Sequence, residues 1–128
     1  MAHVDIWEII PEEKTEFIKT VNHRKKFECL DVASQFLPGG AYTTFRTFEH
    51  SKVLHLDAHL KRLDETANLM GMPININEQV TRSAIKQAVS AFKEEEARIR
   101  LTIDLEFKIG TVFISLEKLT LPTVDDYL

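Results

Sequence analysis

The residues of this sequence that could do chemistry are mostly basic and fall in two places. His59 and Arg62 lie one helical turn apart in "HLKRL", and Arg98 and Arg100 flank Ile99 in "RIRL". A guanidinium donates two parallel N–H groups to a carboxylate or a phosphate, so these positions predict the binding of a small anion. The alternative is that they are ordinary surface residues, because most charged side chains are exposed.

Patterns for other chemistries are absent from the sequence. The five histidines form neither an HExxH motif nor the Cys/His spacing of a zinc site. There is no Gly-rich phosphate loop, and no serine lies in a nucleophile elbow. The acidic run Glu94–Glu96 is typical of a solvated helix end. The sequence therefore favours anion recognition over metal chemistry.

Length and composition predict one domain over residues 1–128. A net charge of −4 and a pI near 5.7 argue against nucleic-acid binding, which needs a positive field. No apolar run is long enough to span a membrane, and the N-terminus is too short and polar for a signal peptide. The single cysteine, Cys29, excludes an intrachain disulfide. We therefore expect a cytoplasmic protein.

The first half of the chain reads as short β segments with irregular stretches between them. Residues 3–10 predict a strand, and residues 11–23 predict a short helix or a loop. Residues 25–36 do not favour one structure. After the break at "LPGG", the β-branched and aromatic residues of 41–48 predict a strand that pairs with 53–56 as a hairpin.

Two amphipathic helices are expected next. Asp57 can cap the first of them, and Gly71 ends it. The second runs from about residue 78 to residue 95 and is capped by Asn77. The apolar stripe of the first helix is Leu56, Leu60, Leu63, Ala67 and Met70. The buried face of the second is Val80, Ala84, Ile85, Ala88, Val89 and Phe92.

The last part of the chain predicts an antiparallel hairpin made by residues 98–106 and 111–119. Strict alternation places an apolar set on one face of the first strand and Arg98, Arg100 and Thr102 on the other. That polar face must look at water or at another protein surface. Together the elements predict an α+β fold, an antiparallel sheet with two main helices packed on one face.

The combination of these motifs resembles a known family. The residues that carry the resemblance are Gly40, Tyr42 and Arg46; His59, Arg62 and Leu63; Gly71; and Arg98, Ile99 and Arg100. Their order and spacing over residues 39–118 resemble the N-terminal small domain of the class IV, fold-type IV pyridoxal-phosphate aminotransferases. That family includes branched-chain aminotransferases, D-amino-acid aminotransferases and aminodeoxychorismate lyase.

The resemblance implies roles for four residues. Arg62 is the candidate for binding the phosphate of pyridoxal 5'-phosphate, and Tyr42 is the candidate for lining the substrate pocket. Arg100 would lie near the substrate. Arg98 is a further candidate for substrate binding and stands where branched-chain enzymes often carry a tyrosine. Thr43 stands where the family commonly has glutamate. The last two differences leave the substrate class open.

The resemblance also limits what this chain does by itself. Family members are about twice this length, and their Schiff-base lysine lies in a second domain. No lysine here matches it, so we expect the chain to be inactive and to bind no cofactor unless a C-terminal domain or a partner chain completes it. The complete protein would act as a homodimer on an amino acid and a 2-oxo acid, or as an aminodeoxychorismate lyase.

Two other interpretations stay open at this point. The chain could be a stand-alone, non-catalytic interaction domain or homodimer module whose sheet face meets a partner. It could also bind a small anion through Arg62 alone.

Overall fold

The centre of the protein is an antiparallel sheet. The computed structural model describes residues 4–10, 18–20, 27, 29–49, 52–74 and 76–119. Its six strands follow the order β2-β1-β6-β5-β3-β4, and every neighbouring pair is antiparallel. The strands are β1 (Val4–Ile9), β2 (Ile18–Thr20), β3 (Gly40–Phe48), β4 (Lys52–Val53), β5 (Ala97–Asp104) and β6 (Val112–Lys118).

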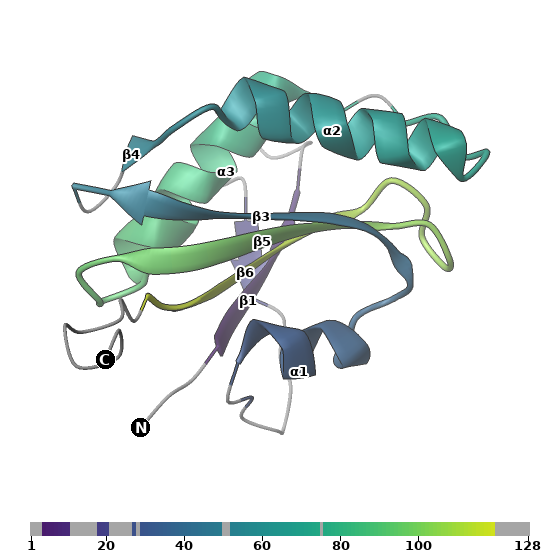
Figure 1. The fold of residues 1–128 in the computed structure, drawn as a ribbon. Coiled ribbons are helices and arrows are strands. Elements are labelled where there is room, and N and C mark those ends of the chain that lie inside the picture. Colours follow the sequence, from purple (N-terminus) through teal and green to yellow (C-terminus); the bar gives the residue numbers. More distant parts are fainter. Residues whose placement is uncertain are drawn as a thin grey trace, which may run out of the picture.

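Helices cover both faces of this sheet. Figure 1 shows α2 (Leu56–Leu69) and α3 (Glu78–Ala91) on one face and the short helix α1 (Leu30–Phe36) on the other. The predicted α+β fold with two main helices on one face is thus confirmed. The helix α1 lies in the segment for which the sequence favoured no structure. Among the described residues, no helix has the length and apolarity needed to cross a membrane.

The main core lies between the sheet and the helices α2 and α3. Alternation along the central strands turns one apolar set toward these helices, as the hairpin pattern predicts. Both predicted helix stripes are buried, apart from a partly buried Val80 and the 54%-exposed Met70. Met70 is exposed because α2 ends just before it, at a turn where Gly71 takes a φ of 75°. The largest fully buried side chains here are Leu63, Ile99, Leu101, Ile103, Ile114 and Leu116.

A second, smaller core lies under α1. It consists of Val4, Ile6, Phe27, Leu30, Ala33, Leu37 and Phe113. The same face of β5 carries Arg100 and Thr102, which are only 5% and 6% exposed. The expectation that this face looks at water or at another protein is therefore wrong for Arg100 and Thr102, because the chain itself buries them, with α1 lying over Arg100. Arg98 remains exposed.

The connection between β3 and α2 differs from the predicted hairpin. In the described part of this connection, residues 52–55, Lys52 and Val53 pair with β3. Leu54 and His55 form a turn in which His55 takes a left-handed φ of 56°. Helix α2 then begins at Leu56 without a side-chain cap, so the predicted capping by Asp57 is wrong. For α3 the predicted cap is confirmed, since the Asn77 side chain accepts a hydrogen bond from the Val80 N–H at 3.0 Å.

The predicted helix or loop over residues 11–23 lies mostly outside the described residues. Within it, Ile18–Thr20 forms β2, which pairs with the end of β1.

Candidate functional site

Helix α2 presents His59 and Arg62 along one side. His59 lies over β3, where its Nδ1 is hydrogen-bonded to Thr43 Oγ1 at 2.9 Å, and its ring centroid lies 4.9 Å from that of Phe45. Burial lowers the pKa of His59, and the nearby positive charges of Arg62 and His55 lower it further. His59 therefore lies between the positively charged side chain of Arg62 and the buried Thr43.

Arg62 differs from the other described arginines in having no acceptor. Its side chain is exposed, and its guanidinium makes no hydrogen bond or ion pair with the part of the chain that the structure describes. The described arginines that do contact an acceptor are Arg46 (with Glu96), Arg82 (with Glu78), Arg98 (with Glu117) and Arg100 (with Asp31). Arg62 can thus offer both guanidinium edges to an anion from solvent.

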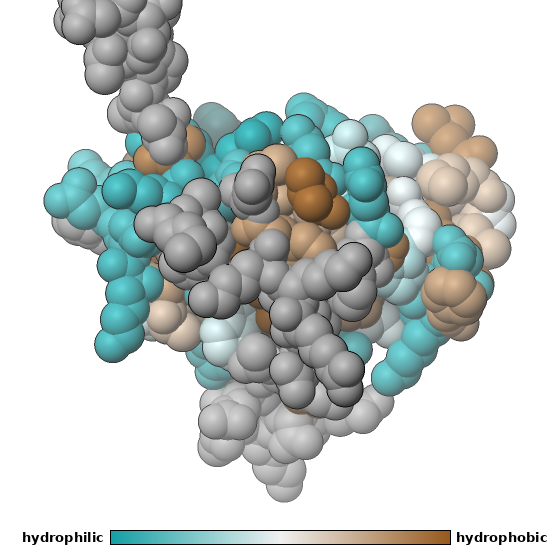
Figure 2. Space-filling view, turned by 90° about the horizontal axis from the view of Figure 1, so that it is seen from below, coloured by the Kyte–Doolittle hydropathy of each residue, from teal (hydrophilic) through white to brown (hydrophobic). Residues whose placement is uncertain are grey.

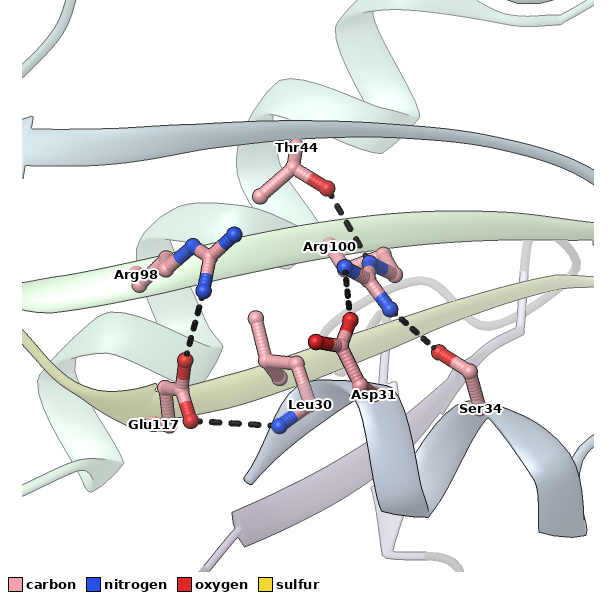
Figure 3. Close-up of polar contacts among 7 residues, drawn as sticks. All are labelled: Leu30, Asp31, Ser34, Thr44, Arg98, Arg100 and Glu117. Carbon is pink, nitrogen blue, oxygen red and sulfur yellow. Dashed lines mark hydrogen bonds and ion pairs between the residues drawn. The ribbon is translucent and has the colours of Figure 1, made fainter.

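Arg100 lies buried on the opposite face of the sheet. Its Nε donates to Thr44 Oγ1 at 3.0 Å, and its two terminal nitrogens donate to Ser34 Oγ at 2.6 Å and to Asp31 Oδ1 at 2.9 Å (Figure 3). Its guanidinium carbon also lies 4.7 Å from the ring centroid of Tyr42. Helix α1 supplies Asp31 and Ser34, so this helix completes the surroundings of Arg100.

Arg98 takes part in a bridge between the sheet and α1. It donates to Glu117 Oε1 at 3.2 Å, and Glu117 Oε2 accepts the backbone N–H of Leu30 at 3.1 Å (Figure 3). The N–H of Leu30 is at the start of α1, where backbone donors have no partner within the helix. Glu117 therefore holds the beginning of α1 against β6 while it neutralises Arg98.

The four predicted site residues form two groups. Tyr42, Arg98 and Arg100 share the α1 face of the sheet, whereas Arg62 lies on α2, on the other face. The outer edge of β3 separates them. Among the described residues, β4 pairs only with Thr47 and Phe48, so residues 40–46 have no strand partner on that side.

The turn between β5 and β6 holds the beginning of β3. The buried Asp104 carboxylate accepts the backbone N–H groups of Glu106, Phe107 and Lys108 at 2.8, 2.9 and 2.8 Å. Glu106 Oε2 in turn accepts the N–H of Gly39 at 2.9 Å. The turn therefore fixes the strand start that precedes Tyr42.

Gly40 follows directly and is needed for close packing. A Cβ at this position would lie 1.7 Å from the carbonyl oxygen of Ile103, so only glycine lets β3 approach β5 here.

Sequence reasoning missed the partners of Arg100 and Arg98. Asp31 and Ser34 lie one turn apart on α1, which puts them on one side of the helix, but the segment gave no helical signal. Glu117 was read only as part of a strand. Nothing local in the sequence pairs these residues with arginines far along the chain.

Hydrophobic side chains are also exposed at the end of the molecule formed by the β5–β6 turn and the C-terminal end of α2. Figure 2 shows them gathered at the right-hand end of the view, where Figure 1 places the β5–β6 turn and the C-terminal end of α2. Leu69, Met70, Phe107 and Ile109 belong to these two segments and are 89%, 54%, 76% and 52% exposed. Such an apolar end is typical of a surface that meets another part of an assembly.

Two further features lie away from the predicted residues. A cavity of about 310 Å³ opens between the end of β1, the start of α3 and the β5–β6 turn, and none of the four predicted site residues lines it. In the described part of the chain, no three His, Cys, Asp or Glu side chains are grouped so that they could hold a metal ion.

Comparison with known families supports the resemblance seen in the motifs. The family model for amino-transferase class IV matches residues 40–128. The chain belongs to the class IV aminotransferase family. No curated protein matches the chain significantly.

Three solved structures of proteins described as aminotransferases share the fold. A putative branched-chain amino acid aminotransferase from Thermotoga maritima is 22% identical, with a TM-score of 0.66 over 95% of this chain and 40% of its own. A putative aminotransferase from Corynebacterium glutamicum is 17% identical, with a TM-score of 0.61 over 92% and 49%. A hypothetical aminotransferase from Mycobacterium tuberculosis, in a PLP-bound form, is 16% identical, with a TM-score of 0.57 over 90% and 40%.

This class IV aminotransferase chain thus spans between two-fifths and one-half of the length of these solved structures.

Proposed function

We propose that residues 1–128 form the N-terminal domain of an enzyme that transfers an amino group between an amino acid and a 2-oxo acid with pyridoxal 5'-phosphate. Membership of the class IV family supports this proposal, since that family is PLP-dependent and one of the similar structures is PLP-bound. The observation that carries it is the unengaged guanidinium of Arg62. A dianionic phosphate fits this group, because guanidinium and phosphate can form two parallel hydrogen bonds.

In this proposal the residues of this chain bind the phosphate of the cofactor and orient the substrate. Arg62 holds the phosphate, and its positive charge, which adds to the effect of burial in lowering the pKa of His59, attracts it. Tyr42 and Arg100, with Arg98 beside them, form the wall that faces the substrate across the outer edge of β3. When bound, the cofactor supplies the electron sink for the chemistry at the substrate's α-carbon.

The Schiff-base lysine is expected to come from elsewhere. All described lysine side chains with known burial are exposed: Lys52, Lys61, Lys86, Lys93, Lys108 and Lys118. A catalytic amine needs a sheltered site, which these positions do not provide. We therefore propose that residues 1–128 do not transaminate alone, and that another domain or a second chain contributes the lysine.

The exposed hydrophobic end supports an assembly. Leu69 and Phe107 would be covered by the further domain or by the second subunit of a homodimer. We propose that this assembly works in the cytoplasm.

Binding of a phosphorylated vitamer tests the role of Arg62. Pyridoxine 5'-phosphate is the probe, because it lacks the aldehyde that would react with exposed lysines, and unphosphorylated pyridoxine is its control. The 128-residue chain alone is not expected to retain the cofactor, but weak binding is enough for this test. Titration followed by ¹H–¹⁵N NMR should show that the chain prefers the phosphorylated form at least tenfold, with shifts centred on residues 59–66.

Two variants make this test specific. Arg62→Ala should remove the preference, because it removes the guanidinium that would donate to the phosphate oxygens. Arg82→Ala is the matched control, since Arg82 is an exposed arginine on the neighbouring helix, paired only with Glu78. Equal affinity of Arg62→Ala and the unmodified chain would overturn the assignment and favour a non-catalytic interaction domain.

A further inference from the structure

Arg100 is the most enclosed cation among the described residues, and a carboxylate of its own chain already neutralises it. The residue is 5% exposed, and each of its three side-chain nitrogens donates to a named acceptor. Two of these acceptors are neutral hydroxyls, of Thr44 and Ser34. Asp31 is therefore the one ion-pair partner of Arg100 in the described structure.

Asp31 differs from Arg100 in its exposure. Its side chain is 76% exposed, and the ion pair uses only Oδ1. Such a carboxylate loses little hydration in the pair, so it can leave Arg100 more easily than a buried partner could. The guanidinium, in contrast, needs an anion, because an unpaired buried charge is strongly unfavourable.

The position of α1 does not depend on Asp31. Glu117 Oε2 accepts the N–H of Leu30 at 3.1 Å, which fixes the start of the helix. Leu30, Ala33 and Leu37 are buried in the small core beneath it. Loss of the Asp31 carboxylate should therefore leave the helix in place and expose the charge of Arg100 to ligands.

We propose that Asp31 is a specificity-determining residue, which neutralises Arg100 and so excludes a second carboxylate from this wall of the substrate pocket. The inference rests on the proposed function, in which Tyr42 and Arg100 face the substrate. A carboxylate on the substrate side chain would face the Arg100–Asp31 pair, which has no net charge to attract it. The negative charge of Asp31 would also repel it. An uncharged side chain lies against the Tyr42 ring without that repulsion. The wall thus selects amino and 2-oxo acids with uncharged side chains.

The experiment measures binding of a dicarboxylate at Arg100. Glutarate is titrated into the 128-residue chain while the Nε–Hε NMR signal of Arg100 is followed. The donation to Thr44 at 3.0 Å protects this proton from exchange, and Arg100→Lys identifies its signal. The variant is Asp31→Asn. Its matched control is Asp57→Asn, which changes the same exposed residue type at the same position of another helix.

The expected result is at least tenfold tighter binding of glutarate at Arg100 in Asp31→Asn than in the unmodified chain and in Asp57→Asn. Equal affinity in all three proteins would overturn the proposal, and so would an equal gain in both variants, which would reflect net charge alone. Asp31→Ala serves as the second variant if the first does not fold. Unfolding of both would also overturn it, since Asp31 would then be needed for the structure.

The two proposals can fail separately. The glutarate titration detects Arg100 on the α1 face, whereas the vitamer titration detects Arg62 on α2. If Arg62→Ala loses the preference for the phosphorylated vitamer but Asp31→Asn does not bind glutarate more tightly, only the role of Asp31 is contradicted. A glutarate gain without any effect of Arg62→Ala contradicts the cofactor assignment only.

Discussion

Replacing Asp104 by asparagine should strongly destabilise the protein at neutral pH. Asp104 is 2% exposed and accepts three backbone N–H groups in the β5–β6 turn, from Glu106, Phe107 and Lys108. In asparagine, an NH₂ group takes the place of one carboxylate oxygen, so one bond is lost and one N–H faces another donor. The remaining bonds also lose the charge that strengthens them.

The expected loss follows from these contacts. Hydrogen bonds to charged groups contribute about 1.5–3 kcal/mol, and an unsatisfied donor costs about 1–3 kcal/mol when it is buried. The N–H of Lys108 can still reach water, because Lys108 is exposed. We therefore expect the free energy of unfolding to fall by about 2–3 kcal/mol, and the melting temperature to fall by roughly 6–12 °C.

The effect should depend on pH in a defined direction. Burial by itself would raise the pKa of Asp104, but the three backbone N–H bonds outweigh it and lower the pKa below its ordinary value. A carboxyl with a lowered folded-state pKa stabilises the protein above the pKa of the unfolded chain. This stabilisation is lost as the pH falls through the folded-state pKa. The difference in the free energy of unfolding between the unmodified protein and Asp104→Asn should therefore be largest at pH 7 and become smaller below about pH 4.

Urea unfolding followed by circular dichroism at pH 7 and at pH 3 measures both effects. Asp64→Asn is the control, because no loss of stability is expected for this variant. Burial raises the pKa of Asp64, and one hydrogen bond from the backbone of Ile76 only partly opposes this. The Oδ1 of Asp64 has no hydrogen-bond partner in the described part of the chain. Removing that charge should leave the stability unchanged or slightly higher at pH 7. A loss below about 0.5 kcal/mol in Asp104→Asn, or an equal loss at both pH values, would refute the reasoning.

Two further predictions concern the strand start and the helix that flank the candidate site. Gly40→Ala should lower the free energy of unfolding by about 3 kcal/mol, because its Cβ would lie 1.7 Å from the Ile103 carbonyl oxygen. In Gly39→Ala the added Cβ would meet the Glu106 carboxylate, which can move, so the free energy of unfolding should fall by less. If urea unfolding shows similar losses for the two variants, the packing argument is contradicted. In an NMR titration, His59 should have a pKa below about 6.5 because burial and nearby positive charge both lower it. Arg62→Ala should raise the pKa of His59, because it removes one of the nearby positive charges. Arg82→Ala is the control and should leave that pKa unchanged. An unchanged pKa in Arg62→Ala would show that Arg62 does not act on His59.

Several elements could be predicted from the sequence because their signals are local. The alternation in "RIRLTID" predicts β5, and the spacing of Leu56, Leu60 and Leu63 predicts α2. The cap by Asn77 likewise depends on a contact within one helical turn. Predictions failed where neighbouring residues compete. Leu54 and Leu56 fit the alternation of a strand. The left-handed conformation of His55 instead ends the strand and lets α2 begin at Leu56, two residues earlier than the predicted hairpin allows.

The candidate site divides in the same way. The motif around Arg62 points to an anion site, because residue types and helical spacing determine which side chains lie side by side on α2. The state of Arg98 and Arg100 could not be predicted from their own segment. Strand alternation places them correctly on one face, yet their partners Asp31, Ser34 and Glu117 come from other elements.

The sequence alone determined the class of fold, the two amphipathic helices, the hairpin of β5 and β6 and the residues of the family motif. Each of these follows from periodicity or spacing over short distances, where backbone geometry fixes which side chains are neighbours. Only the tertiary structure decided that α1 covers Arg100, that Asp31 neutralises it and that Arg62 has no acceptor among the described residues. Those facts depend on contacts such as that between Asp31 and Arg100, 69 residues apart, which form only when the sheet and α1 pack together.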